Sequence, residues 1–390
     1  MAFTQRLQPD FYRDLQASMR EHMREEGLDL LLVDHHQDVA YATGFSHYPN
    51  ERPVVFAITA EAAFLLVPEI ERDYAAVQRA AAEVVNYFEF PGIDRPFQVL
   101  ARAVGLKGGH AGFGPSMEVR RLAQVRAAMP QFQWRESQII DVMRLRKRPE
   151  EILLHREASR ISDAMVAAGR ELVIEALRSG HELPTEAELA SHVVRHGIST
   201  MYAEHENIFL LPSLAGALVY TAENSAFPHG MPSSTHLKPG DTFMLSLGCA
   251  VGGRYAESER TFIIGEPTAK QRHYYETVFE AQRLGTDALM PGTPCGVANR
   301  LCLDVIRDAG YGDYILHRQG HGIGLGNHEP PWVEDGDDTV IAPGMILSSE
   351  PGIYVPGHAG YRISDTVLIT DHGPERLTTT PRDLASAVVA

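Results

Sequence analysis

The first third of the chain alternates between helical and extended hydrophobic patterns. One predicted helix face carries an apolar residue at every fourth position: Phe11, Leu15, Met19 and Met23. Gly27 then ends that helix. The apolar run 28–33 predicts a strand, and the runs 54–58 and 63–67, separated by four turn-like residues, predict a β-hairpin. Because the alternation continues to about residue 140, we expect an α/β domain here.

A basic run from Arg144 to Arg148 marks a change of pattern. It is followed by Pro149 and two glutamates, and proline followed by acids favours the start of a helix, expected to run toward Arg178. The rest mixes short β-rich runs with two helical stretches near 270–290 and 295–309, an α+β pattern. We therefore expect an N-terminal α/β domain over 1–145 and a C-terminal α+β domain over 146–390.

Composition excludes several classes of protein. Lys and Arg number 35 against 51 Asp and Glu, a net charge of −16, which argues against a nucleic-acid partner. Apolar stretches such as 243–251 are shorter than the roughly 20 residues that cross a bilayer, so no membrane association is expected. The N-terminus is charged where a signal peptide is apolar, and the three cysteines form no Cys-x-x-Cys pair. These features predict a cytoplasmic protein.

The segment 253–265 places acids in a predicted strand. Tyr255, Glu257 and Glu259 share one side of it, and Ser258 and Arg260 share the other. Two carboxylates on one face repel each other unless a cation, a metal or a proton lies between them. The alternative is a solvent-facing edge strand.

Three histidines lie in turn-rich segments of the second half. His321 and His328 belong to the glycine-rich stretch 320–331, and His229 lies in the loop 223–232. Imidazole titrates near neutral pH, so these positions suit acid–base or ligand roles. The alternatives are satisfied structural histidines and, for His229, an ordinary surface loop.

Glu350 and Asp365 are each embedded in an apolar run, 345–355 and 361–370. A buried carboxylate needs a partner, a metal or a proton, and the alternative to a functional role is a salt bridge to Arg362 or Arg260. Glycine-rich nucleotide loops and the Gly-x-Ser-x-Gly elbow are missing from the sequence. What remains suits hydrolysis, with or without a metal.

Taken in order, these constellations and the Pro149-Glu-Glu helix start resemble the creatinase and Xaa-Pro peptidase family. The resemblance implies a pita-bread fold for the C-terminal domain and a homodimer. The family's metallopeptidases bind two divalent ions through two aspartates, a histidine and two glutamates. Their positions fall on Ser246, Glu257, His321, Glu350 and Asp365. Because a neutral hydroxyl cannot replace a charged ligand, the ion that depends on position 246 is expected to be absent or very weakly bound.

Ser246 and the run Glu259-Arg260-Thr261 resemble more closely the metal-independent creatinase branch. That likeness implies the following roles: His229 as acid–base, Glu259 and Glu350 as the acids that hold a cationic substrate carbon, His321 and His328 as supporting groups, Tyr255 in the pocket, and Arg52 reaching across the dimer to a substrate carboxylate. Asn50 and Trp332 replace an aromatic residue and an arginine of creatinase, so creatine itself is not the expected substrate.

Three hypotheses follow. The leading one is a metal-independent hydrolase that cleaves a C–N bond in a small carboxylate-bearing substrate and needs no cofactor. The alternative is an Xaa-Pro dipeptidase or aminopeptidase with one divalent cation (Mn, Co or Zn) on Glu257, His321, Glu350 and Asp365. The third is a catalytically silent binding protein. For Cys249, beside the predicted catalytic strand, we expect packing only.

Overall fold

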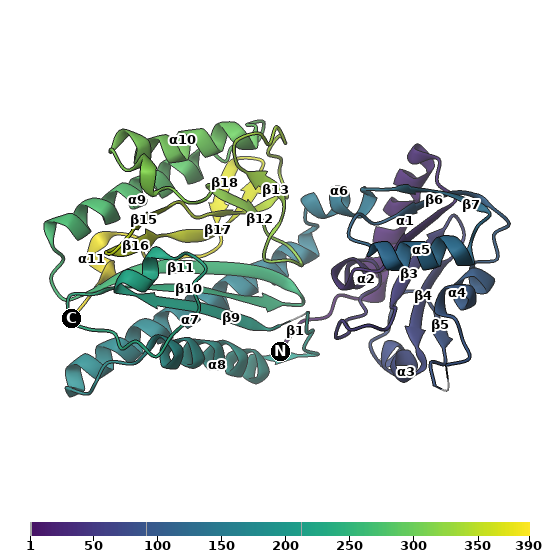
Figure 1. Cartoon of the computed structure of the whole chain (residues 1–390), viewed down its shortest axis with the longest axis horizontal. Helices are drawn as coiled ribbons and strands as arrows, with labels where there is room; N and C mark the ends of the chain where they lie inside the picture. Colours follow the sequence, from purple (N-terminus) through teal and green to yellow (C-terminus); the bar gives the residue numbers. More distant parts are fainter. Residues whose placement is uncertain (1, 91, 212) are drawn as a thin grey trace. The chain divides into compact units, whose positions relative to one another are not determined.

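The computed structural model describes residues 2–90, 92–211 and 213–390. It divides into two compact units: an N-terminal unit containing Thr4–Arg144, and a C-terminal unit containing Leu145–Ile208 and Ser213–Ala390 (Figure 1). No helix among the described residues combines the length and the apolar character needed to cross a membrane.

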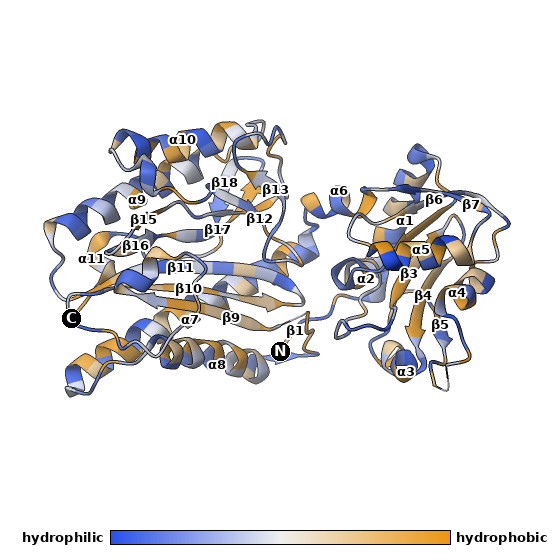
Figure 2. Cartoon of the chain, in the orientation of Figure 1, coloured by the Kyte–Doolittle hydropathy of each residue, from blue (hydrophilic) through white to orange (hydrophobic). Residues whose placement is uncertain are grey.

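The N-terminal unit is built on a six-stranded mixed sheet of order β5-β4-β3-β2-β6-β7. The predicted hairpin is β3 and β4, which pair antiparallel, whereas β6 pairs parallel with both β2 and β7. Figure 2 shows β3 and β4 as hydrophobic strands, and both are buried against the helices. The strands are β2 (Leu30–Val33), β3 (Val55–Thr59), β4 (Ala63–Pro68), β5 (Glu83–Tyr87), β6 (Gly109–Phe113) and β7 (Phe132–Glu136).

The helices of this unit follow the predicted periodicity. In the first helix the four residues of the predicted apolar face are at most 8 % exposed, and Gly27 ends the helix with a left-handed φ of 67°. The helices are α1 (Pro9–Glu26), α2 (His36–Thr43), α3 (Glu69–Val77), α4 (Pro96–Val104), α5 (Val119–Ala128) and α6 (Ile139–Leu145).

The C-terminal unit contains a nine-stranded sheet whose main path is β13-β12-β14-β17-β11-β10-β9, with β18 on β17 and β19 on β11. Two short pairs, β15 with β16 and β1 with β8, complete the strands. The bounds are β1 (Phe3–Thr4), β8 (His205–Glu206), β9 (Ala215–Thr221), β10 (Thr242–Val251), β11 (Arg254–Ile264), β12 (Gly320–Gly322), β13 (Glu329–Val333), β14 (Ile346–Ser349), β15 (Gly352–Val355), β16 (Ala359–Arg362), β17 (Ser364–Thr370), β18 (Gly373–Arg376) and β19 (Val388–Val389).

The long helix predicted after Pro149 is α7 (Pro149–Ser179), which packs on β10 and β11 and against α8 (Glu186–Glu204). Gly169 allows this close approach, because an added Cβ would lie 2.8 Å from atoms of both Leu245 and Val193. The remaining helices are η1 (Ala222–Ala226), α9 (Ala269–Asp287), α10 (Cys295–Asp308), η2 (Gly312–Tyr314) and α11 (Leu384–Ala387).

Strand β11 is an interior strand of the sheet. It forms a hairpin with β10 through Gly252 and Gly253, whose positive φ angles of 58° and 76° suit a tight two-residue turn. On its other side it pairs with β17. Because β11 lies between two strands and is buried along nearly its whole length, the alternative of a solvent-facing edge strand is wrong.

Candidate active site

Three neighbouring strands bring polar side chains to one place. In the sheet register, Glu259 of β11 lies opposite Ser246 of β10 on one side and opposite Ser364 of β17 on the other. Glu257 lies two residues before Glu259, on the same face of β11, as the alternation predicts. Both glutamates are buried, at 6 % exposed.

Glu257, His321 and Glu350 form a compact group around this point. The Nε2 atom of His321 lies 3.1 Å from Oε1 of Glu350 and 3.9 Å from Oε2 of Glu257. One potential ligand atom from each of the three residues lies within 4.8 Å of the others. His321 comes from β12, and Glu350 follows β14.

The orientation of His321 leaves one ring nitrogen available to a ligand. Its Nδ1 lies 3.0 Å from the carbonyl oxygen of Gly322, which only accepts hydrogen bonds, so Nδ1 carries a proton. Nε2 is buried and has no hydrogen-bond partner of good geometry. An imidazole fixed through one nitrogen, with the other directed at two carboxylates, suits a metal ligand.

The proton affinities of the group are strongly perturbed. Burial, reinforced by the charge of Glu350, raises the pKa of Glu257 to about 8. Burial alone would lower the pKa of His321, but the close approach of the Glu350 carboxylate and the charge of Glu257 raise it to about 9. Burial opposes ionisation of Glu350, yet His321 and its neighbours hold the pKa of this carboxyl below its usual range. The group therefore favours a positive charge among its carboxylates.

Glu259 already has an internal cation. Nε of Arg362 lies 2.5 Å from its Oε2, and the hydroxyl of Ser246 donates to its Oε1. Arg362 also donates to the hydroxyl of Tyr354 at 3.1 Å, and that hydroxyl lies 2.8 Å from Nε2 of His317. A series of polar side chains in contact with one another thus extends from β10 to the segment before β12.

Asp365 lies outside this site, which corrects the expectation that it binds a metal. It lies opposite Ser258 in the register and hence on the other face of β11 from Glu257. Its Oδ1 accepts a 2.7 Å bond from Arg260, and its Oδ2 a 2.6 Å bond from Arg376. The salt bridge to Arg260 that the sequence offered as the alternative is therefore present. Ser364, not Asp365, faces Glu257, and its hydroxyl donates to Oε1 at 2.8 Å.

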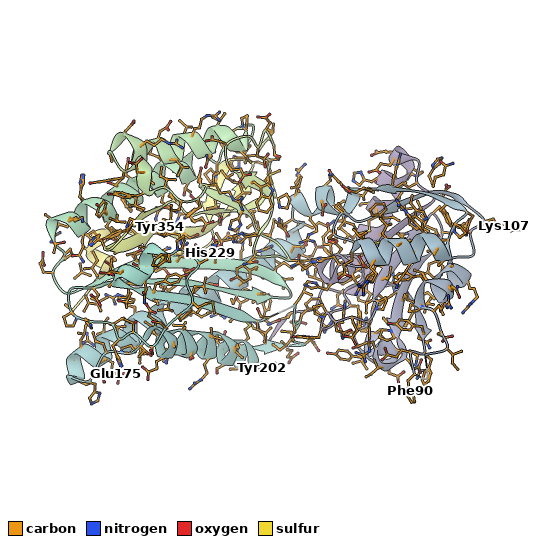
Figure 3. All side chains as sticks on the ribbon, in the orientation of Figure 1. Phe90, Lys107, Glu175, Tyr202, His229 and Tyr354 are labelled. Carbon is orange, nitrogen blue, oxygen red and sulfur yellow. The ribbon has the colours of Figure 1, made fainter. Side chains whose placement is uncertain are left out.

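The other predicted site residues occupy different places. His328 stacks on His321 with ring centroids 3.7 Å apart, and burial, together with the charge of His321, lowers its pKa to about 4. His229 is exposed, and its charge acts on both His317 and His328 (Figure 3). Tyr255 lies on the same face of β11 as Glu257, and its hydroxyl fills the space that a Cβ on Gly248 would occupy.

Arg52 belongs to the N-terminal unit. It is paired with Glu89, Nε to Oε1 at 2.5 Å, and with Glu51 at 3.0 Å. Its expected reach to a substrate in a partner subunit remains a proposal.

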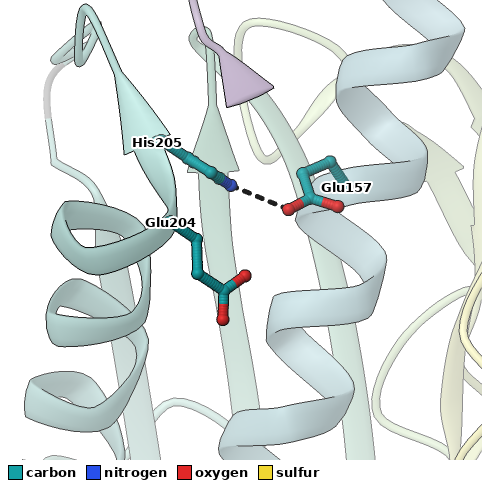
Figure 4. Close-up of side chains that lie close together, drawn as sticks. All are labelled: Glu157, Glu204 and His205. Atoms are coloured by element: carbon teal, nitrogen blue, oxygen red, sulfur yellow. Dashed lines mark hydrogen bonds and ion pairs between the residues drawn. The ribbon is translucent and has the colours of Figure 1, made fainter. Parts of the chain in front are cut away.

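A second cluster of possible ligands, Glu157, Glu204 and His205, joins α7 to the end of α8 (Figure 4). Nε2 of His205 lies 2.7 Å from Oε1 of Glu157. The guanidinium of Arg160 donates to both glutamates and so already supplies their cation. We assign this cluster a structural role.

Comparisons with known proteins agree over most of the chain. Residues 154–371 match the model of metallopeptidase family M24, and residues 16–146 match the creatinase/prolidase N-terminal domain. The Xaa-Pro dipeptidase of Pyrococcus furiosus is 31 % identical over 369 residues, which are 93 % of this chain and 97 % of the relative.

Solved structures give the same result. The prolidase of Pyrococcus horikoshii superposes with a TM-score of 0.81 at 28 % identity, covering 95 % of this chain and 99 % of that one. Dipeptidase PepE of Mycobacterium ulcerans gives 0.84 at 26 % identity, covering 98 % and 99 %. The chain belongs to metallopeptidase family M24. The predicted resemblance and the fold class, an α/β domain followed by a pita-bread domain, are thereby confirmed.

Membership of M24 bears on the choice between a metal-dependent and a metal-independent hydrolase. Relatives with high similarity are dipeptidases of a metallopeptidase family, which favours the metal-dependent alternative over the metal-independent reading that Ser246 suggested. The residues fit one cation: Glu257, Glu350 and Nε2 of His321 converge. They do not fit a second, because Ser246 and Ser364 are neutral where further charged ligands would be needed.

Sequence reasoning missed three residues that contact this polar cluster: Ser364, Tyr354 and His317. His317 lies four residues before His321, so its position next to a candidate site residue could have indicated it. The other two have no local signal, because their importance depends on strand pairing and on contact with Arg362.

Proposed function

We propose that this protein is a metal-dependent hydrolase of the Xaa-Pro dipeptidase type, with one divalent cation held by Glu257, His321 and Glu350. The observation that carries the proposal is that one ligand atom from each of these residues lies within 4.8 Å of the others, Nε2 of His321 being next to both carboxylates. Dipeptide cleavage is proposed from the relatives, which carry that activity in their names.

A bound cation in this position supplies a Lewis acid for the carbonyl group of the scissile bond. The chain's own side chains supply the other groups that the reaction needs. His229, exposed and close enough to affect His317 and His328 electrostatically, exchanges a proton with the departing nitrogen. The buried pair of Arg362 and Glu259 provides a fixed, preorganised charge distribution beside the reacting groups.

The substrate is a small molecule or dipeptide that carries a carboxylate. We retain Arg52 as its anchor within a homodimer, because a guanidinium suits bidentate binding of a carboxylate. The cytoplasmic location also remains part of the proposal, and the buried free thiols of Cys249, Cys295 and Cys302 support it.

The experiment is to load the purified protein with Mn, Co or Zn salts, desalt it, count the retained ions and assay cleavage of a Pro-containing dipeptide. We expect one ion per chain and cleavage that a chelator abolishes. Glu257→Gln removes both, whereas Glu280→Gln, at an exposed pair with Arg283, removes neither. Retention of ions and activity by Glu257→Gln contradicts the proposal.

The metal-independent hydrolase is the second candidate, and the ion pair of Arg362 with Glu259 beside Ser246 favours it. Its substrates are small carboxylate-bearing amidines, lactams and cyclic amidines. Turnover of such a compound without retained metal, unaffected by a chelator and abolished by His229→Ala, selects it. A protein that retains no ion and turns over none of these compounds is the silent binding protein of the third hypothesis.

A further inference from the structure

One fully buried carboxylate in the C-terminal unit has no part in the site described above. Glu186, the first residue of α8, is 0 % exposed. Its Oε1 accepts hydrogen bonds from the backbone N of Thr221 at 2.7 Å and from Nδ2 of Asn224 at 3.0 Å. Its Oε2 accepts from the backbone N of Ser233 at 2.8 Å and from Oγ of the same residue at 2.6 Å.

The charge of Glu186 is balanced by these donors and not by a basic side chain. Among the described residues, no Lys, Arg or His pairs with it. A carboxylate that accepts several N–H and O–H bonds at a helix N-terminus is stabilised without a counter-ion. The arrangement is therefore specific for an acceptor with two oxygens.

The donors stand at the two ends of one loop. Thr221 ends β9, and Ser233 lies where the chain returns to α8. Glu186 therefore accepts hydrogen bonds from both ends of the loop 222–232 and holds them together. His229 lies within this loop. The hydroxyl of Tyr220 adds a 2.7 Å bond to the carbonyl oxygen of Pro228, immediately before His229.

We propose that Glu186 is a positioning residue for His229: it closes the base of the loop and so fixes where the imidazole meets the substrate. This rests on the proposed function insofar as His229 transfers a proton. Misplacing a catalytic group by about 1 Å costs up to 100-fold in rate. The loss falls on kcat more than on KM, because His229 acts on the reacting bond.

Glu186→Gln is the test variant. Its side-chain NH2 group replaces one of the two acceptor oxygens and faces donors of the loop. The hydrogen bonds on that side of the base of the loop are therefore lost. We expect kcat for the Pro-dipeptide to fall about 10- to 100-fold with KM changed less than about threefold. The matched control is Glu188→Gln, in the same turn of α8, because Glu188 caps Thr185 and does not touch the loop.

A double variant separates positioning from a general structural effect. If Glu186 acts through His229, adding Glu186→Gln to His229→Ala causes no further loss of rate. If the rate loss of the double variant equals the product of the losses of the two single variants, the proposal is overturned. Should Glu186→Gln not fold, Asn224→Ala and Ser233→Ala each remove one donor and are expected to give smaller losses of the same kind.

A measurement without turnover distinguishes this proposal from the proposed function. The Cε1–H resonance of His229, assigned by its loss in His229→Ala, is compared in wild type, Glu186→Gln and Glu188→Gln. We expect it to shift or broaden only in Glu186→Gln. An unchanged resonance overturns the positioning role even if the dipeptide is cleaved, and a changed one supports it even if no dipeptide is cleaved.

Discussion

The hydroxyl of Ser364 donates a 2.8 Å hydrogen bond to Oε1 of Glu257. On the other neighbouring strand, Ser246 donates in the same way to Glu259. Both serines face the acids of β11 from the positions where additional charged ligands would stand. The arrangement provides charged oxygens for one cation and neutral hydroxyls where a second would need them.

The number of bound ions follows from these two serines. We expect wild-type protein titrated with Mn²⁺ to retain one ion per chain after desalting. Replacing Ser246 with Asp and Ser364 with Glu together adds two carboxylates and should raise the retained number to two, as counted by elemental analysis. Either single replacement is the control for folding, judged by its melting temperature. Two retained ions in the wild type contradict this reading.

Asp365 should matter for stability and not for the metal. Asp365→Asn leaves the buried guanidinium of Arg260 without its carboxylate, and breaking such a pair costs about 3–5 kcal/mol. We expect that loss in denaturant unfolding, with one ion still bound. Glu375→Gln, which breaks the exposed pair with Arg156, should cost at most about 1 kcal/mol. Loss of the ion with little change in stability would restore Asp365 to the ligand set.

His155 makes the stability of the fold depend on pH. It is fully buried, donates through Nδ1 to the carbonyl oxygen of Tyr255 at 2.7 Å, and burial, with the nearby Lys147, lowers its pKa to about 3. Between about pH 6.5 and 3 the unfolded chain therefore binds more protons at this position than the folded chain. The free energy of unfolding decreases as the pH falls through this window, by at most about 1.4 kcal/mol per pH unit.

We expect His155→Gln to reduce the slope of unfolding free energy against pH between pH 6.5 and 5, measured by denaturant titration. The amide retains a donor for the carbonyl oxygen but does not titrate. His196→Gln, at an exposed position of α8, should leave the slope as in wild type. A slope that is the same in His155→Gln and wild type is the contrary outcome.

The N-terminal unit exposes apolar side chains near Arg52. Phe90 is 79 % and Ile93 78 % exposed, and Glu89, the ion-pair partner of Arg52, adjoins them (Figure 3). For the proposed homodimer we expect a mass near twice 43.1 kDa in light scattering. Phe90→Ser combined with Ile93→Ser should shift it toward the monomer, because an apolar patch buried between subunits is lost. Val119→Ser, at an 85 % exposed position of α5, is the control. A wild-type monomer refutes the dimer.

The sequence determined the elements and the order of the motifs, because these depend on local patterns. The four-residue spacing predicted α1, and Pro149 with its acids predicted the start of α7. Two-residue alternation placed Glu257 and Glu259 on one face of β11 before any partner strand was known. Glycines around His321 marked the segment that supplies the third ligand atom.

Only the tertiary structure decided which acid joins the site. The run around Ser364 and Asp365 is buried on both faces, so its pattern does not say which side faces Glu257. The register of β17 with β11 determines which side chain faces Glu257. A shift of one residue would place Asp365 there in place of Ser364. Likewise, the pairing of Arg362 with Glu259 and of Glu186 with the loop of His229 joins residues far apart in the chain. Such contacts arise from strand order and packing, which no local spacing specifies.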